Sequence, residues 1–117
     1  MRDRTRVMAN AGFVQRVFTY LVNALEGVDE RPALTKDPFH LIVRAMEEAE
    51  KFRELTGTEK YEVVRDALTR LLERQAVLLP STLHEFLQFL LQHRLLASFA
   101  TTIVEATKGN LGVNALS

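Results

Sequence analysis

Apolar residues recur at intervals of three and four along most of the chain, which is the pattern of amphipathic helices. The first stripe predicts a helix over residues 10–25, and a second predicts one from Asp37 to about Leu55. A third helix is predicted to begin at Thr56. No alternating run rich in Val, Ile and Thr predicts a strand, so the pattern indicates an all-α fold. The three stripes consist of Val14, Val17, Phe18, Leu21 and Leu25, then Phe39, Ile42, Ala45, Met46, Ala49 and Phe52, then Tyr61, Val64, Leu68, Leu71 and Leu72.

Capping residues mark where the second and third helices begin. Asp37 is a good N-cap, and Pro38 would then occupy the first helical position, where its missing N–H costs nothing. Thr56 and Glu59 have the spacing of a capping box, although Thr58 could serve as the cap instead. The short connection between these helices predicts an αα-hairpin. The segment over residues 26–36 is polar and contains a proline, which predicts a loop.

The fourth predicted helix begins at Ser81 or Thr82, after Leu79-Pro80, and is expected to run to about Thr107. At about 100° per residue, the polar side of its first half lies roughly half a turn from the polar side of its second half. The helix could break near residues 92–94, but no Gly or Pro marks a break. Otherwise it is continuous and different neighbours cover its two halves. The two polar groups are Glu85, Gln88 and Gln92, then Arg94, Ser98, Thr101 and Glu105.

A long apolar C-terminal helix in a bundle of about four helices has only three others to cover it. Its second half is therefore expected either to pack under the first helix or to bind a second copy of the chain or another protein. The partner-interface candidates on this helix are Leu91, Leu95, Leu96, Phe99, Ile103 and Val104.

The chain is predicted to form a single domain, with a basic N-terminal arm over residues 1–9, a helical domain over 10–107 and a C-terminal tail over 108–117. Its 117 residues, 47% of them hydrophobic, suit one core and are too apolar for intrinsic disorder. No signal peptide is expected, because no continuous apolar run follows the N-terminal arginines. A membrane span is not expected either, since polar residues interrupt the most apolar stretch, 86–104. These features favour an intracellular location.

Candidate chemistry is sparse. The absence of Cys excludes disulfides and thiolate sites, and there is no Gly-rich phosphate loop and no nucleophile-elbow motif. His84 and His93 are nine residues apart, so they do not share a helix face. The carboxylates of Glu47, Glu48, Glu50 and Glu54 fall opposite the apolar stripe and are expected to face solvent. We therefore expect no catalytic residue, no metal, no cofactor and no small-molecule substrate.

The net charge of the chain is zero, but the charged residues are distributed unevenly along it. Fifteen basic and fifteen acidic residues give a net charge of zero, which disfavours general nucleic-acid binding. Arg2, Arg4 and Arg6 could contact phosphate on a lipid surface or a nucleic acid, or could belong to an ordinary terminus. The last 42 residues, from Ala76, carry only four charged side chains. The charge-poor end is thus the expected contact surface.

Three segments together resemble small helical proteins encoded by large nucleocytoplasmic DNA viruses. They are Thr56-Gly57-Thr58-Glu59-Lys60, Leu79-Pro80 and the run from Ile103 to Asn114, and the similarity spans about residues 38–114. The resemblance implies a virion-associated structural or accessory protein, such as a minor capsid or membrane-proximal component. The sequence as a whole predicts a non-enzymatic structural or protein-interaction component that assembles through its last helix. The alternatives are a peripheral, holin-like membrane-associated protein and a helical nucleic-acid-binding regulator.

Overall fold

The computed structural model describes residues 2–36 and 38–102 of the chain, and the side chains of residues 10–36 and 39–102. This part of the chain contains no strand, so the predicted all-α class is confirmed for it. Residues 96–102 form a further helical segment at the end of the described chain. The preceding elements are α1 (Arg2–Glu26), α2 (Arg31–Lys36), α3 (Pro38–Glu50), α4 (Gly57–Arg74), the 3-10 turn η1 (Ala76–Leu78) and α5 (Ser81–Gln92).

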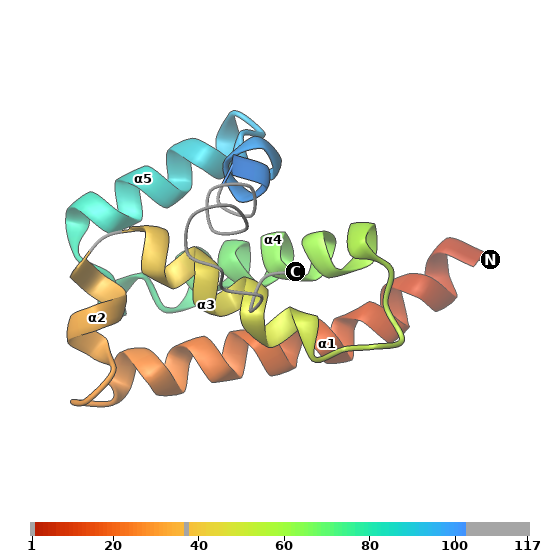
Figure 1. Ribbon diagram of the computed structural model, residues 1–117, viewed down its shortest axis with the longest axis horizontal. Helices are drawn as coiled ribbons and strands as arrows, with labels where there is room; N and C mark the ends of the chain where they lie inside the picture. Colours follow the sequence, from red (N-terminus) through yellow and green to blue (C-terminus); the bar gives the residue numbers. More distant parts are fainter. Residues whose placement is uncertain (1, 37, 103–117) are drawn as a thin grey trace.

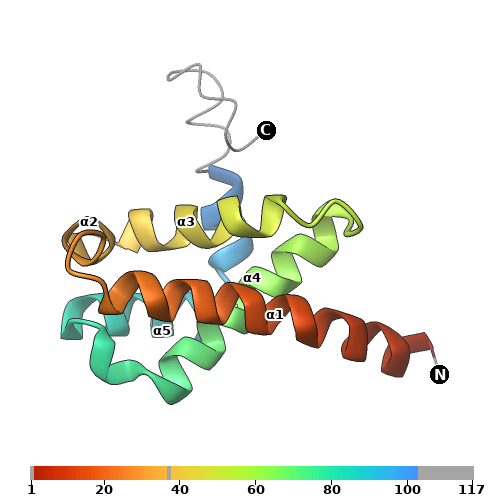
Figure 2. The same ribbon diagram turned by 90° about the horizontal axis from the view of Figure 1, so that it is seen from below.

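The longest helix, α1, crosses the whole bundle and contacts α2, α3, α4 and η1 (Figure 1). Its N-terminal end projects beyond the other helices in both views (Figures 1 and 2). The consecutive helices α3 and α4 pack on each other, and α5 packs against both. This arrangement leaves the segment over residues 96–102 beside α3 and α5.

The core includes most residues of the three predicted helix stripes. All five stripe positions of α1 are buried, and no polar or charged side chain in the described residues is buried. In α3 and the turn after it, Ile42, Ala45, Ala49 and Phe52 are buried as predicted, whereas Phe39 is 42% exposed. The helical spacing of apolar residues therefore predicted most of the core correctly.

The N-terminal boundary of the first helix differs from the sequence prediction. The helix begins at Arg2 rather than at residue 10, so the backbone of the predicted arm belongs to α1. Residues 2–9 contain neither Gly nor Pro, and Arg, Met and Ala are good helix formers. The prediction started the helix where the apolar stripe starts, although a helix can extend beyond its packed part.

The short helix α2 replaces part of the predicted loop. Pro32 lies in its first turn, where a backbone N–H has no helical partner, and Leu34 is 1% exposed. The Arg31 guanidinium donates from Nη1 to the carbonyl oxygens of Leu25, at 3.2 Å, and Leu78, at 2.7 Å. These bonds satisfy a carbonyl in the last turn of α1 and attach α2 to η1. Because contacts with distant residues stabilise this helix, the local sequence pattern did not predict it.

The capping box at the start of α4 is confirmed. The Glu59 backbone N–H donates to Thr56 Oγ1 at 3.2 Å, and the Thr56 N–H donates to Glu59 Oε1 at 2.9 Å. Thr56 is therefore the cap, and Thr58 is not. The preceding helix begins at Pro38 as predicted but ends at Glu50, five residues before the predicted end at Leu55. The expected cap Asp37 lies outside the described residues.

The predicted long C-terminal helix is wrong over the described residues, because α5 ends at Gln92 and helical structure resumes only at residue 96. Arg94 has a φ of 55°, in the left-handed region. The Leu95 N–H donates to the Leu90 carbonyl at 2.8 Å, and the Arg94 N–H to the Leu91 carbonyl at 3.4 Å. This is the Schellman pattern, which ends a helix by satisfying its last carbonyls. It explains why the polar face changes direction here without Gly or Pro.

Arg94→Gly is expected to raise the free energy of unfolding by about 0.5–1 kcal/mol, because a side chain at a left-handed position costs about 1 kcal/mol that Gly does not incur. Urea denaturation measures the change. Gln88→Gly, at an exposed position inside α5, is the matched control and should lower stability by about 1 kcal/mol. Equal losses in both variants would contradict the left-handed assignment at Arg94.

Candidate functional site

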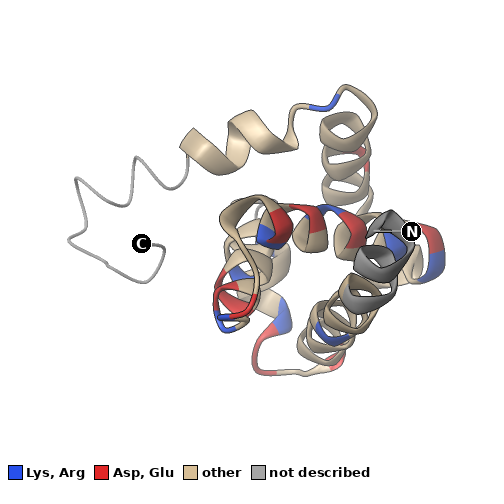
Figure 3. Ribbon diagram, turned by 90° about the vertical axis from the view of Figure 1, so that its right-hand side faces the viewer, with Lys and Arg blue, Asp and Glu red and all other residues tan. Residues whose placement is uncertain are grey.

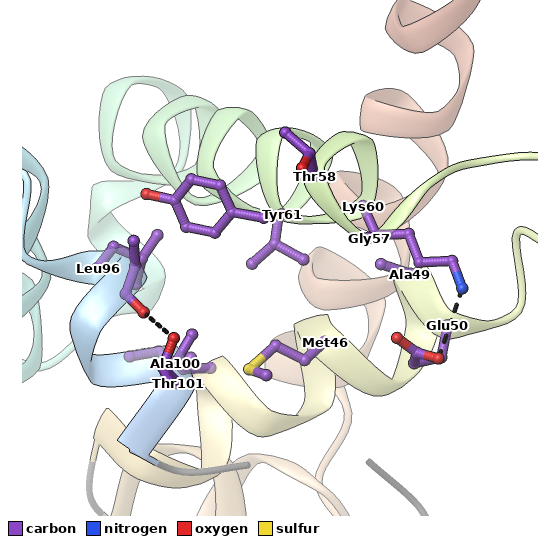
Figure 4. Close-up of a pocket in the computed structure, with 13 residues that line it drawn as sticks. Met46, Ala49, Glu50, Gly57, Thr58, Lys60, Tyr61, Leu96, Ala100 and Thr101 are labelled. Atoms are coloured by element: carbon purple, nitrogen blue, oxygen red, sulfur yellow. Dashed lines mark hydrogen bonds and ion pairs between the residues drawn. The ribbon is translucent and has the colours of Figure 1, made fainter. Parts of the chain in front are cut away.

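An open apolar groove with a volume of about 550 Å³ lies between α3, α4 and residues 96–102 (Figure 4). Three elements far apart in the sequence form its walls, and two of these are the helices predicted as a hairpin. Most of the lining side chains are apolar, and the polar ones stand mainly at its rim. The apolar lining consists of Ile42, Met46, Ala49, Gly57, Tyr61, Val64, Leu96, Ala97 and Ala100.

Helical periodicity explains why these residues share one hollow. On α3 the apolar lining positions are 42, 46 and 49, and on α4 they are 57, 61 and 64, so the apolar part of each wall follows the same spacing of four and three. The third wall presents Ala97 and Ala100, whose side chains end at Cβ. Larger apolar residues at these two positions would fill the space. The groove therefore exists because one wall is built from small residues.

The two ends of the groove differ. At one end, Lys60 Nζ lies 3.5 Å from Glu50 Oε2, so an ion pair joins α4 to α3 (Figure 4). At the other end, Tyr61 and Leu96 separate the groove from an adjoining hollow of about 330 Å³. We call this space the arginine hollow; its lining residues are Tyr61, Arg65, Leu90, Leu91, Arg94 and Leu96. The groove is thus apolar along its length. At one end the charges of Glu50 and Lys60 cancel each other, and at the other end two guanidinium groups flank the groove.

The predicted interface residues fall into different environments. Leu96 is 1% exposed and packs against the core of the chain. Phe99 is half-buried, and its ring centroid lies 5.4 Å from that of Phe39 and 5.6 Å from that of Phe86. Leu91 is partly buried and lines the arginine hollow, while Leu95 is 39% exposed.

Two further interface candidates, Ile103 and Val104, lie outside the described residues. Inside them, the segment over residues 96–102 contacts residues of α3 and α5 through aromatic rings and shares the groove with α4. These contacts therefore do not support the alternative in which the first helix covers this end. The side chains of Arg2, Arg4 and Arg6, the candidate phosphate contacts, are also outside the described set.

Charged side chains of both signs are interspersed on the helices, whereas residues 95–102 carry none (Figure 3). On α3, Arg44 pairs with Glu30 at 3.2 Å. Just beyond α3, the Lys51 ammonium lies 3.0 Å from Glu48. The hydrogen bond to Glu48 raises the pKa of Lys51 above its ordinary value. Of the carboxylates predicted to face solvent, Glu50 and Glu54 are exposed, whereas Glu47 and Glu48 are partly buried.

A second hollow, of about 570 Å³, lies between α1 and α4 and has a different character. Arginines and carboxylates of α4 alternate along it, and Arg70 Nη1 donates to Gln15 Oε1 at 2.7 Å. The Arg65 Nε likewise donates to Asp66 at 3.1 Å. Because both signs of charge are present side by side, this surface does not select one charge. This hollow therefore offers less basis for selective binding of a partner than the apolar groove does.

The described residues contain no group of three or more His, Cys, Asp or Glu side chains placed to hold a metal ion. None of the helices in the described part of the chain combines the length and the apolar character needed to cross a membrane. Comparisons with protein-family models, with curated proteins and with solved structures find no match to this chain.

Proposed function

We propose that this protein is a non-enzymatic interaction module that binds an amphipathic helix of a partner protein in the groove between α3, α4 and residues 96–102. The observation that carries the proposal is the open apolar groove of about 550 Å³. In helix-in-groove recognition, a partner helix places apolar side chains at i, i+3 or i+4, and i+7 into such a trough. Burial of those side chains supplies the binding free energy.

The shape of the groove favours a helix over a small molecule. Its α4 wall extends from position 57 to 64, which is about 10 Å of helix axis and matches about two turns of a partner. Ala97 and Ala100 allow a partner backbone to approach closely, as small residues do at other helix contacts.

The motif resemblance supplies a setting for this module. On that basis we propose that it acts as a virion-associated structural or accessory component and that the bound helix belongs to another protein of the particle. The resemblance supports the setting, whereas the groove supports the mode of binding. The two parts of the proposal can therefore fail separately.

Blocking the groove tests the binding mode. The probe is a displayed library of 16-residue helical peptides, selected on the full chain and measured by fluorescence anisotropy. Ala97→Trp places an indole in the groove and is expected to weaken the selected peptides more than about tenfold, because the apolar contacts are lost. Ser98→Trp is the matched control: position 98 is exposed, adjacent and outside the groove lining, so binding should not change.

Circular dichroism of both variants verifies that the fold is retained. A selection that yields no peptide sensitive to Ala97→Trp would overturn the proposal. Multi-angle light scattering tests the remaining occupant, a second copy of the chain. Concentration-dependent dimers that Ala97→Trp abolishes would assign the groove to self-association instead and would also overturn binding of a separate partner.

A further inference from the structure

We infer that the partner helix carries a carboxylate beyond its apolar stripe, near its C-terminal end, and that Arg94 and Arg65 in the arginine hollow bind this group. The inference rests on the proposed function and adds the chemistry and the direction of the bound helix. It follows from the charges at the two ends of the groove.

Arg94 has an available guanidinium at one end of the site. The residue is exposed and lines the arginine hollow, and its side chain has no hydrogen bond or ion pair among the described residues. Arg65 lines the same hollow; its Nε donates to Asp66 Oδ1 at 3.1 Å, its guanidinium carbon lies 6.0 Å from the centroid of the Tyr61 ring, and its Nη atoms have no hydrogen bond or ion pair among the described residues. The residues that line this hollow include two guanidinium groups and no carboxylate. A guanidinium binds a carboxylate through two parallel N–H donors.

The backbone at Arg94 supports a role for its side chain. Its φ of 55° and the Schellman hydrogen bonds around it define a position that Gly occupies most readily. The turn therefore does not require an arginine. A strained residue whose polar group is exposed beside an apolar groove is the kind of outlier from which a binding role is inferred.

The opposite end of the groove sets the direction. Glu50 and Lys60 neutralise each other across α3 and α4, so that end attracts neither charge strongly. A helix carries a partial negative charge at its C-terminus, and a carboxylate there adds to it. Charge complementarity therefore orients the partner with its C-terminal end on Arg94 and Arg65 and its N-terminal end toward the Glu50–Lys60 pair.

The test uses groove-dependent peptides from the helical library, each made with its C-terminal Asp or Glu and with the matching Asn or Gln. Removing the carboxylate is expected to weaken binding to the unmodified chain about tenfold, the size of one charge-assisted contact. Arg94→Ala should weaken the acidic peptide and reduce the difference between the two peptides, and Arg94→Ala combined with Arg65→Ala should make the two peptides equivalent. Arg94→Lys should restore part of the difference. Arg74→Ala, at the end of α4 and outside the arginine hollow, is the matched control and should change nothing.

The possible failures are distinguishable. Groove-dependent peptides that show no acidic preference, or whose preference Arg94→Ala leaves undiminished, would overturn this inference while leaving the proposed function intact. A preference for lysine at that end would overturn it in the same way. If no selected peptide responds to Ala97→Trp, the proposed function fails and the inference fails with it.

Discussion

Phe52→Ala is expected to lower the free energy of unfolding by about 3–5 kcal/mol, the usual cost of removing a buried aromatic ring. Phe52 follows the end of α3 and is only 2% exposed. Its ring centroid lies 4.6 Å from that of Phe13, and the Arg16 guanidinium lies 4.8 Å from it. The side chain thus attaches the α3–α4 connection to α1. The total free energy of unfolding of a domain of this size is about 5–15 kcal/mol, so this loss is a large share of its stability.

Urea denaturation followed by circular dichroism measures this effect. Val77→Ala is the control, since Val77 is 87% exposed on η1 and should change stability by less than about 0.5 kcal/mol. Comparable small effects at both positions would show that the connection over residues 51–56 does not pack against α1.

Leu96→Ala is expected to lower the free energy of unfolding by about 2–4 kcal/mol, whereas Leu95→Ala should cost less than about 1 kcal/mol. The neighbours differ because Leu96 is 1% exposed and Leu95 is 39% exposed. Leu96 packs against the core and forms part of the groove wall, so its loss leaves a cavity at the start of the 96–102 segment. Chemical denaturation of the two variants makes the comparison directly.

The sequence prediction placed both leucines in a partner interface, which would leave the stability of the isolated chain nearly unchanged in either variant. A change within about 0.5 kcal/mol for Leu96→Ala would therefore favour that earlier interpretation over the packing described. Hydrogen exchange adds a second readout, since loosening of the segment should appear first in the amides of residues 96–102.

Arg94 connects stability with the proposed binding. Arg94→Gly is expected to stabilise the chain, because Gly suits the left-handed backbone, and to weaken the binding of an acidic peptide, because the guanidinium is gone. Opposite changes in these two quantities would indicate that the side chain is present for recognition. They can be measured on the same preparation of the variant.

Local patterns predicted the features that depend on neighbouring residues. The α1 stripe and the Thr56–Glu59 capping box involve residues three or four apart, so the chain encodes them almost independently of the rest of the fold. The short helix α2 was missed because its stability depends on distant contacts. Arg31, for example, donates to the carbonyl of Leu78, 47 residues away.

The residues of the groove show the same contrast between local features, which the sequence predicts, and features that depend on distant contacts. Periodicity assigned Met46, Tyr61 and Val64 to apolar faces, whereas the change of polar face near residues 92–94 left open whether the last helix breaks there. The amino-acid order thus specified which residues are apolar and which helix faces they share, because these depend on rotation about a single helix axis. Tertiary packing decided that Ala97 and Ala100 line an open groove together with Met46 and Tyr61. This depends on how separate helices lie against one another, which no local spacing encodes.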